Sequence, residues 1–164
     1  MIQLSKRLNA VAELLVHGID QLELEQPVLA DIGTDHAYLP VYLVQKKVVK
    51  KAYAADVRKG PLLHAKEHIE QYGLGEYIQT RLSDGGESFV PGESEVAVIA
   101  GMGGGLMQKI LSGSPEFFEK NSCVVLQSQS EIEQFRRFLT EDGWCILEED
   151  MVLSLIHISE PTRL

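Results

Sequence analysis

At 164 residues the chain is long enough for one hydrophobic core and one domain. Its hydrophobic content of 45% and charged content of 24% are those of an ordinary soluble globular protein, and no stretch of about 18 apolar residues predicts a membrane span. The net charge of −9 counts against a nucleic-acid-binding protein, because phosphate contacts normally leave a basic surface. One basic cluster, formed by Lys46, Lys47, Lys50 and Lys51, stands out in this acidic chain. The N-terminus lacks the apolar core of a signal peptide, so we expect a cytoplasmic protein.

Apolar periodicity predicts helices and strands that alternate along the chain. Leu4, Leu8, Val11 and Leu15 have helical spacing, with Ser5 near the start of that helix. The expected strands are residues 28–32, 52–56, 78–82, 96–100, 124–127 and 144–151. Further helices are expected at 41–45, at 59–72, from about 105, and around Ile132, Phe135 and Leu139. The alternation indicates an α/β fold, with a mostly parallel sheet covered by helices on both faces.

The segment Asp31-Ile-Gly-Thr-Asp-His-Ala-Tyr-Leu-Pro40 carries the most information about function. It joins a buried strand to a helix, as the cofactor-binding corner of an open α/β sheet does. A dinucleotide fingerprint has three glycines there, whereas this chain has Gly33 followed by Asp35 and Ala37. A carboxylate at the middle position repels a pyrophosphate but not S-adenosylmethionine, which carries an amino group and a sulfonium. The motif therefore favours S-adenosylmethionine over NAD.

Acidic residues follow each of the first three predicted strands. Asp31 and Asp35 come first, then Asp56, then Asp84. Ligands of open α/β sheets bind at the carboxyl ends of the strands, and Asp56 lies where a carboxylate accepts both ribose hydroxyls. Taken singly, Asp56 could be a helix N-cap and Asp84 a turn residue. Three acids at three successive strand ends favour one shared site.

Five segments together resemble the bacterial family that methylates N1 of adenine 22 in tRNA. They are Leu4-Ser-Lys-Arg-Leu8, Asp31 to Pro40, Gly60-Pro61, Ser83-Asp-Gly85 and Ile99-Ala-Gly-Met-Gly-Gly104. The resemblance implies a Rossmann-like methyltransferase fold that uses S-adenosylmethionine, with tRNA as the partner and Asp84 on the adenine N6 amine of the cofactor. The residues that it assigns to the cofactor are Asp31, Gly33, Asp56, Asp84, Gly85, Ala100 and Gly101. The residues assigned to the substrate are Lys6, Arg7, Met102, Gly103 and Gly104.

The glycine-rich turn Ala100-Gly-Met-Gly-Gly104 bears on which atom is methylated. Methyltransferases that act on exocyclic amines often carry an Asn- or Asp-Pro-Pro-aromatic turn here, and this chain does not. Glycine lets the backbone approach a flat base, which fits a ring nitrogen whose lone pair attacks directly. Methylation at N1 leaves a cationic base, so Asp35 is the expected stabilising carboxylate. His36 and Tyr38 are expected to stack on or hydrogen-bond the base; the alternatives are a helix-start residue and a packed aromatic.

Two other features predict no metal site. His64-Ala-Lys-Glu-His68 has the H-x-x-E-H form of some zinc peptidases, but the helical projection puts both histidines on the solvent flank, as an exposed helix face. Cys123 and Cys145 lack metal-ligand spacing and are expected to be buried, reduced thiols.

The tail from Leu153 does not continue the family pattern and resembles the translation of a transposase adapter used in DNA library preparation. A genuine divergent tail is the alternative. We therefore expect an incomplete methyltransferase domain at residues 1–152, a non-native tail at 153–164, and a longer natural protein. The last strand of the sheet would then be missing, leaving the strand at 144–151 unpaired unless the tail substitutes for it.

Two other functions stay open on the sequence alone. A methyltransferase of the same fold acting on another RNA or on a small molecule is one, and a non-catalytic RNA-binding module is the other. The acids at the strand ends disfavour the second, because a scaffold needs none of them. The oligomeric state cannot be predicted from these residues.

Overall fold

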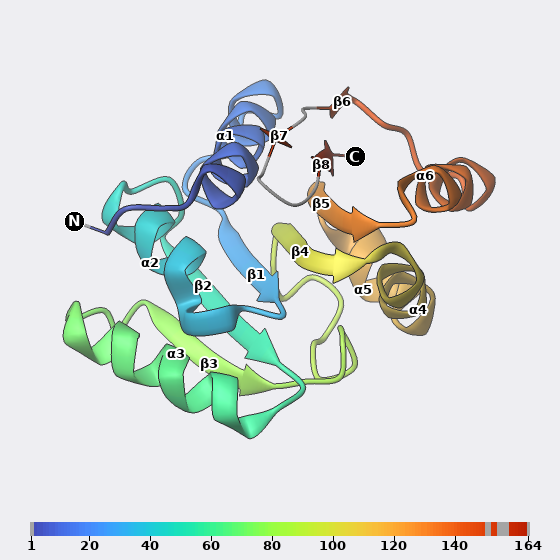
Figure 1. The fold of residues 1–164 in the computed structure, drawn as a ribbon. Helices are drawn as coiled ribbons and strands as arrows, with labels where there is room; N and C mark the ends of the chain where they lie inside the picture. The colour runs from blue at the N-terminus through green and yellow to red at the C-terminus, as the bar shows by residue number, and fades with distance from the viewer. Residues whose placement is uncertain (1, 150–151, 154–157, 164) are drawn as a thin grey trace.

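Helices and strands alternate along the chain, as the periodicity predicts (Figure 1). The structure, a computed structural model, describes residues 2–149, 152–153 and 158–163. The strands are β1 (Val28–Ile32), β2 (Lys51–Asp56), β3 (Ile78–Leu82), β4 (Val96–Gly103), β5 (Cys123–Ser130), β6 (Glu148–Glu149), β7 (Val152–Leu153) and β8 (Ile158–Arg163). The helices are α1 (Lys6–Gln21), α2 (Tyr38–Gln45), α3 (Lys59–Gln71), α4 (Gly104–Gly113), α5 (Pro115–Lys120) and α6 (Ile132–Glu141), with one 3₁₀ turn, η1 (Asp35–Ala37).

The sheet has the strand order β3-β2-β1-β4-β5-β8-β6, and β7 pairs with β8. Strands β1 to β5 are parallel, which confirms the predicted fold class. After β1 the chain builds β2 and β3 on one side and then crosses back to place β4 on the other. This reversal beside β1 opens a crevice at the carboxyl ends of the strands, where open α/β sheets bind ligands.

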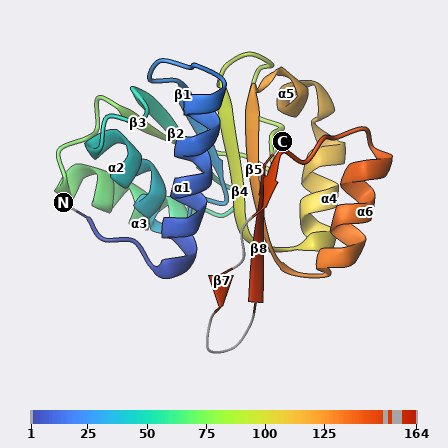
Figure 2. The same ribbon diagram turned by 90° about the horizontal axis from the view of Figure 1, so that it is seen from above.

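Helices cover both faces of the sheet, as predicted (Figure 2). Alternate strand residues supply the two faces: Leu29 packs on the side of α1 and α2, whereas Ala30 packs on the side of α4 and α6. Because both faces are buried, the central strands β1, β2 and β4 are mostly apolar, as is usual for parallel sheets, whereas the edge strand β3 carries polar residues along its length. In the central strands the polar residues therefore gather at the ends.

Local sequence explains the helices that flank this core. Ser5 caps α1 by accepting a hydrogen bond from the Leu8 N–H at 3.2 Å, and α1 buries Val11 and Leu15 against the sheet. α5 was not predicted, because the Gly113-Ser-Pro115 segment is typical of a loop. Its first residue is Pro115, which suits the first helical position, and the burial of Phe117 and Phe118 holds this short helix in place.

Strand bounds agree with the predictions in the first half of the chain and depart from them later. β1 and β3 have the predicted bounds, whereas β4 and β5 continue beyond theirs because they still pair where Met102 faces Ser128. The predicted strand at 144–151 is largely wrong. Among the described residues of that range, only Glu148 and Glu149 form a strand. Residues 150 and 151 lie outside the described part.

The tail enters the sheet, which is the alternative left open by the sequence: the tail substitutes for the family's last strand. β8 runs antiparallel between β5 and β6, with Val125 opposite Arg163 and Ser128 opposite Glu160. The tail therefore takes the place in which the family's last strand was expected. That residues 153–164 are non-native stays a prediction.

Two further expectations concern the membrane and the cysteines. Among the residues that the structure describes, no helix is both long and apolar enough to cross a membrane. Both cysteines are free, and Cys123 is buried as predicted. Cys145 is exposed, which corrects the prediction, because the residues after α6 form no strand there and do not cover it.

Replacing residues 158–163 by a glycine–serine sequence of equal length should lower the melting temperature and promote aggregation. β5 would lose its antiparallel neighbour, and unsatisfied backbone groups in a buried setting cost roughly 1–3 kcal/mol each. Circular dichroism melts and light scattering measure both effects. A glycine–serine replacement of Pro91 and Gly92, which are both exposed in a surface loop, is the control. Equal melting temperatures for the tail variant and the original chain would show that β8 adds nothing to the sheet.

Candidate functional site

A cavity of about 640 Å³ opens at the carboxyl ends of β1 to β4, within the size range of small-molecule sites. Its lining comes from the ends of the parallel strands and from α1, α4 and β5. The predicted cofactor and substrate residues in its wall are Arg7, Asp31, Gly33, Asp35, Asp56, Asp84, Gly85, Ala100, Gly101, Met102 and Gly103. The fold thus brings together residues as far apart in the chain as Arg7 and Gly103, which are 96 positions apart.

Asp31 is the most perturbed acid of the site. It is buried at the end of β1, and its Oδ2 accepts a hydrogen bond from the Thr34 hydroxyl at 2.9 Å. Burial raises the pKa of Asp31 most, the Thr34 hydrogen bond opposes that rise, and the negative charges of Asp56 and Asp35 add to it, so that the pKa reaches about 7. The site therefore holds a carboxyl group that a bound cation would help to ionise.

The turn after β1 keeps the cavity floor open. Gly33 has φ +74°, and the backbone N–H groups of Gly33 and Thr34 both donate to the Ala55 carbonyl at 2.8 Å. A side chain at position 33 would collide with the terminal methyl group of Met102. The positive φ therefore favours glycine here, whereas the Met102 methyl group is the far end of a flexible side chain that can move aside.

Asp56 and Asp84 lie on the side of the cavity formed by β2 and β3. Asp56 is buried, and its Oδ1 accepts from the Arg58 N–H at 3.0 Å, so it also supports the start of α3. Asp84 is exposed toward the cavity mouth. The Ser83 hydroxyl donates to the Gly85 carbonyl at 2.7 Å and fixes the turn that carries Asp84.

Sequence reasoning missed a polar network on the opposite wall. Gln127 is completely buried in β5, and its Oε1 accepts from the Gly101 N–H at 2.8 Å and from Arg7 Nη1 at 3.2 Å. With its amide oriented to donate to the Gly101 carbonyl, Gln129 also accepts from Arg7 Nη1 at 3.1 Å. These contacts hold the Arg7 guanidinium in the wall of a cavity that has more acidic than basic residues. The signal was a glutamine that ends the apolar run of β5, since buried polar groups need partners.

Four predicted residues fall outside the cavity wall. Lys6 is exposed on α1, and His36 and Tyr38 lie just beyond Asp35. Gly104 is buried where α4 begins, and a Cβ there would lie 2.9 Å from the Glu131 carbonyl oxygen. The structure thus gives Gly104 a packing role beside the end of β5, and its predicted substrate contact stays a prediction.

Four rings gather beside the cavity. His36 stacks with Tyr38 and with His64, at centroid distances of 5.3 and 5.1 Å, and His68 contacts both His36 and Tyr38. His68 Nδ1 also donates to the His36 carbonyl oxygen at 2.9 Å. The interpretation of His64 and His68 as a plain solvent-exposed face is therefore wrong for His68, which is partly buried and hydrogen-bonded.

The backbone that carries His36 is strained. Asp35, His36 and Ala37 have φ of 38°, 62° and 59°, three successive non-glycine residues in the left-handed region. Each such residue costs roughly 1–3 kcal/mol, and strain of this kind is concentrated at ligand-binding sites. The surrounding contacts, above all the hydrogen bond from His68, must offset that cost.

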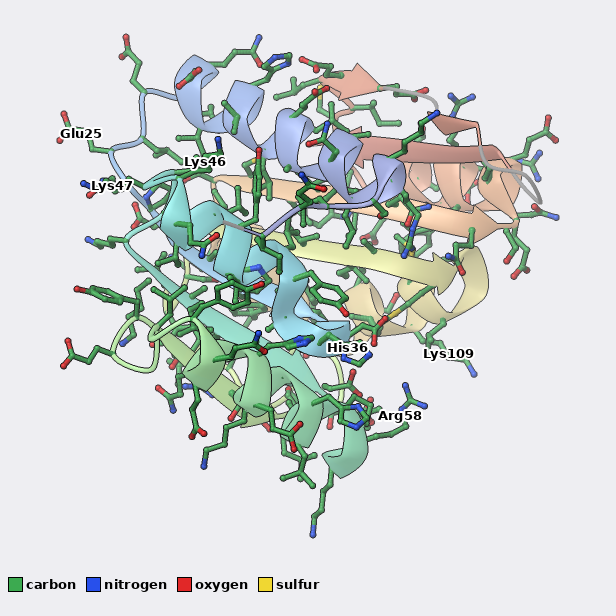
Figure 3. All side chains as sticks on the ribbon, turned by 60° about the vertical axis from the view of Figure 1, so that its left-hand side comes forward. Glu25, His36, Lys46, Lys47, Arg58 and Lys109 are labelled. Carbon is green, nitrogen blue, oxygen red and sulfur yellow. The ribbon has the colours of Figure 1, made fainter. Side chains whose placement is uncertain are left out.

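The basic cluster singled out in the sequence does not lie at this site. Lys46 and Lys47 follow α2 and precede β2, at the amino ends of the parallel strands. Figure 3 shows them at the opposite end of the molecule from His36, Arg58 and Lys109. The cluster therefore cannot contact the part of a substrate that enters the cavity.

Replacing Asp31 by asparagine should change how stability depends on pH. Because the folded pKa of about 7 exceeds the ordinary value of 3.8, the folded chain holds a proton that the unfolded chain releases, and stability falls as pH rises from about 4 to about 7. Asparagine removes this contribution, whose slope is at most about 1.4 kcal/mol per pH unit. Urea unfolding at pH 5 and pH 7.5 measures it, with Asp20→Asn, at an exposed position of α1, as control. Identical pH dependence in Asp31→Asn and the original chain would contradict the assignment.

Comparison with known proteins agrees with this geometry. The chain is 36% identical to the tRNA (adenine(22)-N(1))-methyltransferase of Bacillus subtilis over 148 residues, which cover 90% of the chain and 59% of that relative. Its fold superposes on the crystal structure of the B. subtilis m1A22 tRNA methyltransferase TrmK with a TM-score of 0.88 and 33% identity, covering 99% of this chain and 66% of that one. It superposes on M. capricolum TrmK in complex with S-adenosyl-homocysteine with a TM-score of 0.84 and 31% identity, covering 99% and 68%.

The chain thus spans 59% of the length of the curated relative that it matches. The profile described as "Methyltransferase domain" matches residues 4–158, nearly the whole described structure. The resemblance inferred from the five motifs is confirmed, and the chain belongs to the methyltransferase domain family.

Proposed function

We propose that this chain transfers a methyl group from S-adenosylmethionine to N1 of an adenine in tRNA, adenine 22 by analogy with its relatives. The observation that carries the proposal is the single cavity in which Asp31, Asp56 and Asp84 meet from three successive strand ends. Beside those strand ends, Gly33 and Gly101 contribute backbone without side chains to the cavity wall. A tRNA substrate would also place the protein in the cytoplasm.

The groups in the cavity fit the parts of S-adenosylmethionine. Arg58 occupies Asp56 Oδ1, so Oδ2 is the oxygen that we assign to the ribose hydroxyls. Asp84 at the end of β3 is assigned to the adenine N6 amine. Asp31 suits the cationic amino group, because a neighbouring positive charge favours the ionised carboxylate. The carboxylate of the cofactor needs a cation, and Arg7 is the one that Gln127 fixes to the wall.

The same wall argues against NAD. Asp35 lines the cavity where a dinucleotide site would have its second glycine, and it would face a pyrophosphate with a negative charge. Arg58 is engaged by Asp56. A phosphate-rich cofactor would therefore meet more negative than positive charge in this cavity.

When bound, S-adenosylmethionine supplies an electrophilic methyl group on its sulfonium. The chain has to align the adenine with it, and good alignment can be worth roughly 7–11 kcal/mol. Gly101 and Gly103 leave room for a flat base at the end of β4. Adenine N1 has a free lone pair, so no residue has to remove a proton from the attacking atom. Asp35, exposed at the cavity mouth, would stabilise the positive charge that develops on the base.

Two measurements test the proposal. Calorimetry with S-adenosylmethionine and with NADH should show binding of the first only. Single-turnover methylation of an unmodified tRNA transcript should label the transcript with adenine at position 22, while a matched transcript with guanine there stays unlabelled. Equal labelling of both transcripts would point instead to another nucleotide, and binding without any labelling would favour an RNA-binding module.

Asp56→Ala should weaken S-adenosylmethionine binding by about 1–3 kcal/mol, because the ribose hydroxyls would lose a charged acceptor. Calorimetry measures the change, and melting curves check that the variant folds despite losing the Arg58 contact. Arg58→Ala is the matched control, since it removes the side-chain ion pair with Asp56 and keeps both the carboxylate and the backbone N–H that donates to it. Unchanged affinity in folded Asp56→Ala would remove Asp56 from the site.

Asp35→Ala should lower the rate of methyl transfer far more than it lowers cofactor affinity. The side chain is 78% exposed, so its loss costs little packing, but the developing cation would lose its nearby carboxylate. Single-turnover methylation at saturating cofactor, beside calorimetry, separates the two effects. Equal losses in rate and in affinity would make Asp35 a cofactor ligand only.

A further inference from the structure

We propose that the ring cluster of His36, Tyr38, His64 and His68 is a stacking surface for an unpaired nucleobase of the RNA, adjacent to the adenine that enters the cavity. This inference rests on the proposed function and adds a second point of contact to it. Of the four rings, only His36 and Tyr38 belong to a motif shared with the family; His64 and His68 come from α3.

The rings form a continuous array. His36 and His64 are parallel, with 1° between their planes and 5.1 Å between their centroids. Tyr38 lies 5.3 Å from His36 and 5.0 Å from His68, which closes the group. The two pairs that contain His36 are stacked, whereas Tyr38 and His68 are tilted by 36°. A further flat ring can extend a stacked pair.

Part of the array lies at the surface, unlike the aromatic group around Phe117. Phe89, Phe117 and Phe118 also contact one another, but they are buried in the core beside α4. His64 is exposed and the His36 side chain is 35% exposed, whereas Tyr38 is partly buried and packs against the core. Core packing therefore accounts for Tyr38 but not for the rings of His36 and His64.

The array is held rigidly. The hydrogen bond from His68 Nδ1 to the His36 carbonyl fixes a segment of three left-handed residues, and that segment directs the His36 ring toward α3. Strained backbone persists where the surroundings over-determine it, and such places coincide with ligand clamps. A rigid surface loses little conformational freedom when a base binds.

Its position fits a neighbouring base and not the reacting one. Asp35 lines the cavity, whereas His36, the next residue, lies outside the wall. A nucleotide inside the cavity would therefore place the adjoining nucleotide over the rings. Proteins bind single-stranded RNA by stacking unpaired bases on histidine and tyrosine rings. Stacking also suits a chain with a net charge of −9, which has few cations for phosphates.

The test uses the 164-residue chain and three unmodified tRNA transcripts: one intact, one without the base before the target adenine, and one without the base after it. We expect one of the two abasic transcripts to bind the original chain roughly 5- to 150-fold more weakly than the intact one. His64→Ala should lose most of that difference and raise the KM for the intact transcript, with the cofactor Kd unchanged. Gln71→Ala, exposed on the same helix, is the control.

The outcomes separate this inference from the proposed function. Methylation of the intact transcript with equal binding of all three transcripts would overturn the stacking surface alone. If His64→Ala weakened binding of every transcript by the same factor, the rings would only support the loop, and the inference would be wrong. Failure of the original chain to bind or methylate the intact transcript would overturn both. Melting curves of His64→Ala check the fold.

Discussion

The arrangement of the site depends on burying the carboxyl group of Asp31 at the reversal point of the sheet. Burying an unpaired charge is costly, and here a single hydroxyl, that of Thr34, is the hydrogen-bond partner. The group responds with a pKa of about 7, near the boundary between its neutral and ionised forms. A ligand that brings a positive charge would release this penalty, so the fold keeps an energetic preference for cations at the end of β1.

The wall opposite Asp31 supplies positive charge to the cavity. Arg7 introduces positive charge into an acidic cavity, and Gln127, a neutral side chain, fixes it without cancelling its charge. A glutamate at the same place would pair with Arg7 and neutralise it. The same Gln127 oxygen also holds the Gly101 N–H, so the cation and the glycine turn are tied together. The site therefore presents separate negative and positive walls, as an amino-acid zwitterion requires.

The sequence predicted the parts of this arrangement that follow from local pattern. Asp31, Asp56 and Asp84 were identified because each lies at or just after the carboxyl end of a predicted strand, and parallel strands bring such residues to one edge. The roles of Gln127 and His68 could not be found in this way, because each depends on a contact between segments far apart in the chain. The cluster at Lys46 and Lys47 was visible in the sequence, but its distance from the site was not. Charge density along the sequence does not indicate which end of a sheet carries the charge. Whether the tail substitutes for the last strand could not be decided from the sequence either, because the origin of a segment does not determine whether its backbone can pair with an open strand edge.

Net charge and RNA binding can be reconciled once the charges are placed. Several of the acids surround the cavity, where they face a cationic cofactor and a base that becomes cationic, and these acids need not meet the RNA backbone. At the rim, Arg58 and Lys109 lie on the same side as the rings around His36 (Figure 3). With few cations, binding cannot draw much free energy from the release of counterions. Contacts to unpaired bases would have to supply the difference, and rings that are exposed, stacked and held on a strained backbone are the feature of this surface best suited to make them.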